Sequence, residues 1–206
     1  MSDQTQPQIY LITPHDFDIE TFPAQLNSVL AAHDVACVRV ALSTRDEARI
    51  IKCADAVREI CHQHDVAVVI ESHVLMVERL GLDGVHFKDG GRLVRKIRKE
   101  LGDDAIIGAF CGPSRHDGMN ACEGGADYVS FGPLSGSLLG DGTLAERDVF
   151  EWWSEMIEVP VVAEGGLTLD IVRDLAPITD FFAFGDEIWE TPDPAHTLAE
   201  FIAAMS

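Results

Sequence analysis

The chain alternates short runs of apolar, often β-branched residues with longer segments in which apolar residues recur at a helical period. Short apolar runs are typical of strands that are buried on both faces, and longer amphipathic segments are typical of helices. The predicted strands are 9–13, 36–41, 67–71, 84–87, 106–110, 128–131, 161–164 and 181–184. The predicted helices are 22–33, 45–64, 74–80, 92–101, 116–123, 146–157, 169–175 and 195–205.

Eight strand and helix pairs within 206 residues predict a closed parallel barrel of the (β/α)8 or TIM type, in one α/β domain that spans residues 1–206. An open doubly wound sheet is the alternative, but it would need fewer strands and a glycine-rich turn after the first strand. The residues after the first strand begin with Pro14, His15 and Asp16. The G-x-G-x-x-G pattern of dinucleotide-binding sheets is therefore absent at this position.

Charge and composition argue against nucleic acid and membranes as partners of the chain. Lysine and arginine number 15 against 35 acidic residues, a formal net charge of -20, and such a surface repels nucleic acid. No apolar window is long enough for a membrane segment, and residues 1–7 do not resemble a secretion signal, so we expect a cytoplasmic protein. The five cysteines lack C-x-x-C spacing, which indicates reduced thiols. We therefore expect a small-molecule substrate, and a barrel of this size is compatible with a homodimer.

In a TIM barrel the chemistry lies at the C-terminal ends of the strands. The most polar cluster predicted there comes from the third and fourth strands, with Glu71 and His73 on one and His86 and Asp89 on the other. It is either an acid/base set of Glu71, His73 and His86 or a divalent-metal site of Glu71 and Asp89. The structural alternative is that His86 is a histidine at the edge of the core and that Asp89 caps a helix. Lys88 is either a substrate anchor or a partner of Asp89.

Glycines follow the last two predicted strands. Gly165 and Gly166 come after the seventh strand and Gly185 after the eighth, where exposed backbone N–H groups can form a cradle for phosphate. The alternative is that these glycines only permit tight turns. Glu164 and Asp186 directly flank the glycines, so the sequence predicts two negative charges where a phosphate would approach.

Five segments carry a further resemblance along nearly the whole chain. They are I-Y-L-I-T at 9–13, L-G-L-D-G-V-H at 80–86, I-G at 107–108, G-G-A-D-Y-V-S-F-G-P at 124–133 and V-P-V-V-A-E-G-G at 159–166. In these segments the chain resembles the thiamine-phosphate synthase and thiazole tautomerase superfamily of (β/α)8 barrels. The resemblance implies thiamine biosynthesis and a transferase that joins an aminopyrimidine pyrophosphate to a thiazole phosphate, releasing pyrophosphate with the help of Mg²⁺.

The resemblance also implies a phosphate site, which this chain has altered. The family's V-Q-L-R-E-K reads V-R-V-A-L-S at 38–43, its N-D-R reads E-S-H at 71–73, and its lysine after strand six is missing. Glu71 and Asp89 are the substitute Mg²⁺ ligands on this interpretation. The substrate-binding residues are then Lys88, Ser137, Gly165, Gly166, Gly185 and Asp186.

Three functions follow from these observations. The first is the synthase reaction. The second is an acid/base isomerisation or tautomerisation of a weakly charged small molecule, which needs no pyrophosphate site. The third is a non-catalytic barrel that binds a ligand at its mouth.

Overall fold

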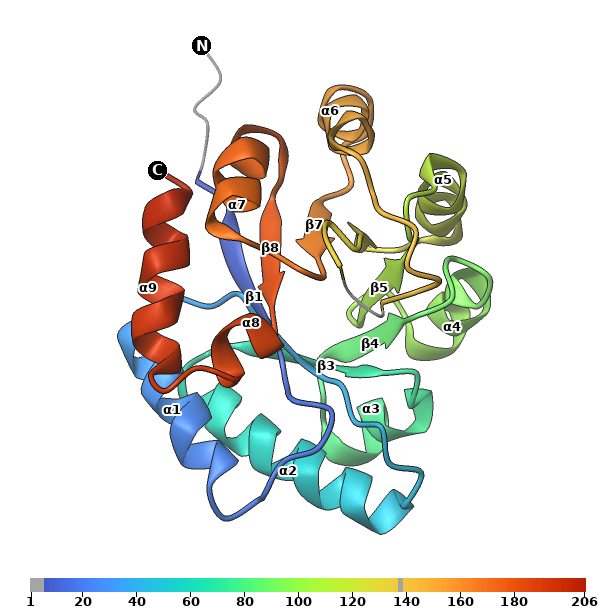
Figure 1. The fold of residues 1–206 in the computed structure, drawn as a ribbon. Coiled ribbons are helices and arrows are strands. Elements are labelled where there is room, and N and C mark those ends of the chain that lie inside the picture. Colours follow the sequence, from blue (N-terminus) through green and yellow to red (C-terminus); the bar gives the residue numbers. More distant parts are fainter. Residues whose placement is uncertain (1–5, 137–138) are drawn as a thin grey trace.

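Eight parallel strands close into a barrel in the computed structural model, which describes residues 6–136 and 139–206. The strands pair in chain order, and β1 pairs with β8 to complete the ring (Figure 1). The predicted TIM barrel is therefore confirmed. The strands are β1 (Gln8–Ile12), β2 (Cys37–Val40), β3 (Ala67–Glu71), β4 (Gly84–Phe87), β5 (Ile106–Phe110), β6 (Tyr128–Phe131), β7 (Val161–Glu164) and β8 (Phe181–Phe184).

Helices surround the barrel on the outside, as Figure 1 shows. They are α1 (Phe22–Ala32), α2 (Glu47–Gln63), α3 (Val74–Leu80), α4 (Val94–Leu101), α5 (Arg115–Gly124), α6 (Arg147–Met156), α7 (Leu169–Leu175), α8 (Asp186–Trp189) and α9 (Pro194–Ala204), with a 3₁₀ turn at Ala176–Ile178. Eight of these match the predicted helices to within about two residues. The additional helix, α8, is a single turn directly after β8, too short to show an amphipathic period.

Successive residues of each strand face opposite sides of the sheet. Outward residues such as Leu11, Val38 and Phe182 pack under the helices in the main core. A smaller cluster that includes Tyr10 and Tyr128 fills the barrel interior. This interior is close-packed, because a Cβ atom added at Gly108 would lie 2.0 Å from the Tyr128 ring.

The cysteines and the helices agree with the composition of the chain. All five cysteines are free, and four of them are buried. Within 6–136 and 139–206, no helix combines the length and the apolar character that crossing a membrane requires.

Candidate functional site

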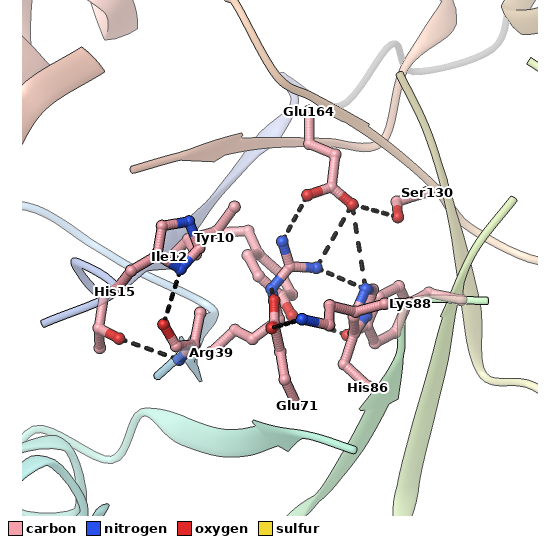
Figure 2. A network of polar contacts seen from close by, with 12 residues as sticks. Tyr10, Ile12, His15, Arg39, Glu71, His86, Lys88, Ser130 and Glu164 are labelled. Atoms are coloured by element: carbon pink, nitrogen blue, oxygen red, sulfur yellow. Dashed lines mark hydrogen bonds and ion pairs between the residues drawn. The ribbon is translucent and has the colours of Figure 1, made fainter. Parts of the chain in front are cut away.

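A network of buried charged groups lies inside the barrel, at the level where the strands end (Figure 2). Its centre is Arg39, an inward-facing residue of β2 with 3% of its surface exposed. The guanidinium binds the Glu164 carboxylate of β7 through both terminal nitrogens, and its Nε lies 3.4 Å from Glu71 Oε1 of β3. Ser130 of β6 donates a further hydrogen bond to Glu164. Four strands thus contribute to one connected unit.

The charges of this network compensate one another. Burial by itself lowers the pKa of the Arg39 guanidinium, but the adjacent Glu164 carboxylate outweighs burial and holds that pKa well above its usual range. Lys88 Nζ lies 3.3 Å from Glu71 Oε2 on the side that faces the mouth. Two cations therefore stand against two carboxylates, which is how buried charges are tolerated.

His86 of β4 extends the network toward the barrel interior. Its Nε2 lies 2.6 Å from Arg39 Nη1 and its Nδ1 lies 2.9 Å from the Tyr128 hydroxyl, which in turn contacts the Tyr10 hydroxyl at 2.7 Å. Burial, followed by the positive charges of Arg39 and Lys88, lowers the pKa of His86 well below its usual value. Because arginine has no acceptor, Nε2 of the neutral ring accepts the bond and the proton lies on Nδ1.

This protonation state predicts an acid-sensitive stability. The unfolded chain protonates His86 as the pH falls below about 6.5, whereas the folded chain keeps it neutral. Its contribution to stability is thus present above that pH and lost below it. Between pH 7.5 and pH 5.5, the wild type should lose about 1.4 kcal/mol more unfolding free energy than His86→Gln.

Urea unfolding at the two pH values measures this difference. His196→Gln, which removes an exposed histidine on α9, serves as the matched control and should follow the wild type. An equal loss in wild type and His86→Gln would show that His86 carries its proton in the folded state.

The other predicted residues of strands β3 and β4 lie nearer the solvent. Lys88 is the first residue after β4, and 57% of its side chain is exposed. Asp89 follows it on the surface. His73 is half-buried at the start of α3, and its imidazole makes no hydrogen bond within the described chain. The structure therefore brings Glu71, His86 and Lys88 together around Arg39 and leaves His73 and Asp89 outside this network.

Backbone N–H groups from the loops after β7 and β8 converge on one side chain, Glu187. Gly166 N and Leu167 N lie 3.1 and 3.2 Å from Glu187 Oε1, and Gly185 N lies 2.8 Å from Glu187 Oε2. Asp186 is exposed at the start of α8. Ser137, predicted to bind substrate, lies outside the described residues.

The prediction that Glu164 lies beside the glycine loop after β7 is wrong. The Glu164 carboxylate does not approach the glycine cradle, because strand alternation turns it inward onto Arg39, where it is 1% exposed. The acid that reaches the cradle is Glu187, which is absent from the predicted site residues. Arg39 is the second residue missed. Its signal is a charged side chain within an otherwise apolar strand, C-V-R-V at 37–40.

The proposed magnesium ligands meet a physical obstacle. Mg²⁺ is held by one or two carboxylates together with substrate phosphates. Both oxygens of Glu71 already face cations, Arg39 Nε and Lys88 Nζ, so this carboxylate does not fit a dication in the arrangement observed. In the described part of the chain, no three His, Cys, Asp or Glu side chains form a metal-binding group. Asp89, the other predicted ligand, makes no ion pair within residues 6–136 and 139–206.

The fold is a TIM barrel, and these polar groups lie toward the C-terminal ends of its strands, where TIM-barrel enzymes hold their substrates. A family model described as thiamine monophosphate synthase matches residues 9–183. The chain belongs to this family, and thiamine biosynthesis is its setting.

Individual relatives agree with this membership, and a solved structure shares the fold. The thiamine-phosphate synthase of Rhodospirillum centenum is 37% identical over 204 residues, covering 98% of this chain and 99% of that protein. That of Erythrobacter litoralis is 36% identical, covering 96% of each. Thiamine phosphate pyrophosphorylase from Pyrococcus furiosus superposes with a TM-score of 0.82 at 19% identity, over 96% of this chain and 95% of that one, and so shares the fold.

Proposed function

We propose that the protein joins an aminopyrimidine, activated as its diphosphate, to a thiazole. A bond between the two heterocycles forms as the bond from the pyrimidine portion to diphosphate breaks, and diphosphate leaves. The observation that carries this proposal is the extent of the relationship, because the similarity to a named thiamine-phosphate synthase covers 98% of the chain. A cytoplasmic location, a homodimer and a requirement for Mg²⁺ stay predictions.

Lys88 is the residue to which we assign the leaving diphosphate. A diphosphate that departs needs positive charge to offset the charge it develops. Lys88 stands at the mouth on a partly exposed side chain and shares its charge with the Glu71 carboxylate at 3.3 Å. Arg39 is buried and already bound on both sides, so it supports Glu71 and Glu164 rather than the substrate. The glycine loops of β7 and β8 flank the thiazole end in this assignment.

An acid/base isomerisation has less support from the contacts. His86, the histidine nearest the centre, is neutral, and both of its ring nitrogens are engaged by Arg39 and Tyr128. A general base needs an available lone pair within reach of the substrate. No contact in the described chain favours this reaction.

The proposal is tested with purified protein, the aminopyrimidine diphosphate, Mg²⁺ and the thiazole, supplied both with and without its phosphate. Chromatography of the coupled product should show turnover with at least one thiazole. Lys88→Met should lower kcat/KM by about 10- to 100-fold, the loss expected for one contact to a charged group. Lys96→Met, on the exposed face of α4, removes the same charge away from the site and should leave kcat/KM near the wild-type value.

Absence of any coupled product from folded protein would refute the proposed reaction. If kcat/KM is equal in Lys88→Met and Lys96→Met, the protein still catalyses the coupling, but Lys88 does not bind the leaving diphosphate.

A further inference from the structure

Three backbone N–H groups from two loops converge on a single side chain. Gly166 and Leu167 follow β7, Gly185 follows β8, and all three donate to the carboxylate of Glu187 at 2.8 to 3.2 Å. Convergent backbone amides form an anion-binding concavity. The loops after the seventh and eighth strands are also where TIM barrels commonly hold a substrate phosphate. The anion site is thus present, and the anion in it belongs to the protein.

The backbone around this cradle is held in place. Gly166 has a φ of +69° and Gly165 one of +88°, a conformation that turns the loop sharply and that side chains other than glycine rarely adopt. The Ser135 hydroxyl donates to the Gly166 carbonyl at 2.6 Å, which fixes the orientation of that residue. The donors therefore point at the carboxylate as part of the loop structure.

Glu187 itself has no competing partner. Within 6–136 and 139–206, its carboxylate pairs with no lysine or arginine, so its polar contacts are the three amides. The side chain is half-buried on α8, and Asp186 next to it adds a second negative charge. Loss of the Glu187 carboxylate would leave three oriented donors to receive another anion.

A substrate phosphate and the Glu187 carboxylate exclude each other from this cradle. A phosphate monoester carries a charge of about -1.5 to -2 at pH 7 and would need the same three donors. A hydroxyl group, by contrast, can donate to a lone pair that the carboxylate has left. The Glu187 carboxylate therefore repels a substrate phosphate and can accept a hydrogen bond from a substrate hydroxyl at the same position.

We propose that Glu187 determines specificity at this end of the site: its carboxylate occupies the position of a substrate phosphate and selects a substrate that presents a hydroxyl there. That the substrate is an unphosphorylated thiazole rests on the proposed function. The exclusion of phosphate rests on the backbone contacts alone.

The test is a titration of the full chain with inorganic phosphate, followed by the amide resonances of Gly166, Leu167 and Gly185. Glu187→Ala removes the carboxylate, and Glu187→Gln keeps its size without its charge. Glu190→Ala, at the exposed end of α8, is the control that removes one negative charge nearby without touching the cradle. The chemical-shift dispersion of the same spectra reports whether each variant is folded.

Phosphate should shift the three amides saturably in Glu187→Ala, with a Kd at least tenfold lower than in the wild type. Glu187→Gln should fall between the two, and Glu190→Ala should match the wild type. Equal phosphate binding in wild type and Glu187→Ala would overturn the assignment, as would a failure of phosphate to reach these amides in either folded Glu187 variant. Because no turnover is measured, a failed coupling reaction leaves these outcomes unchanged.

Discussion

Arg39→Met should lower the free energy of unfolding by about 3–5 kcal/mol, the loss expected when one member of a buried ion pair is removed. Methionine keeps much of the length of arginine, so the effect comes mainly from charge. The variant leaves Glu164, 1% exposed, without its guanidinium partner, and leaves Glu71 with Lys88 alone. His86 also loses the donor to its Nε2.

Urea unfolding followed by circular dichroism gives this difference. Arg79→Met is the control, because Arg79 also pairs with a carboxylate, Glu47, but on the surface, where both side chains are more than half exposed. Its unfolding midpoint should stay close to that of the wild type. A similar, small shift in both variants would contradict a central role of Arg39 in the barrel.

The double variant Arg39→Met/Glu164→Gln separates charge from packing. Glutamine removes the charge that Arg39→Met leaves unpaired and can still accept the hydrogen bond from Ser130. The double variant should therefore be more stable than Arg39→Met alone, with Glu71 and Lys88 as a remaining pair. If it is less stable, the penalty of Arg39→Met comes from lost packing and not from an uncompensated carboxylate.

The barrel could be predicted because its signal is repeated eight times. Each strand is an apolar run buried on both faces, and each long helix has a periodic apolar face, so an error in one element does not change the class of fold. The single turn of α8 is too short to show such a period, so the sequence does not predict it. That omission matters for function, because α8 carries Glu187.

The site was harder to predict, since its contacts depend on which side of a strand a residue faces. Arg39 lies within β2 and not after it, so the rule that chemistry follows each strand does not identify this residue. Adjacency to Gly165 suggested that Glu164 faces the glycine loop, whereas strand alternation places it on the inner surface of the barrel. Two acids, Asp186 and Glu187, follow Gly185. The sequence alone does not indicate which of them turns back to accept the Gly185 N–H, and in the structure it is Glu187.

The second large effect is expected in the choice of thiazole. Coupling of the unphosphorylated thiazole should exceed coupling of its phosphate by at least tenfold in kcat/KM, equivalent to about 1.4 kcal/mol. Two unit charges of the same sign 4 Å apart repel by about 4 kcal/mol at an effective dielectric constant of 20, so the Glu187 carboxylate is sufficient for this discrimination. Glu187→Ala should reverse the preference, because the three amides then become available to phosphate.

A competition between the two thiazoles in one reaction tests the role of Glu187 most directly. Folded protein receives the aminopyrimidine diphosphate, Mg²⁺ and equal concentrations of the thiazole and its phosphate, and mass spectrometry identifies the first products. We expect thiamine to form in excess over thiamine phosphate. Excess thiamine phosphate would contradict the role of Glu187, and the absence of both products would contradict the proposed reaction.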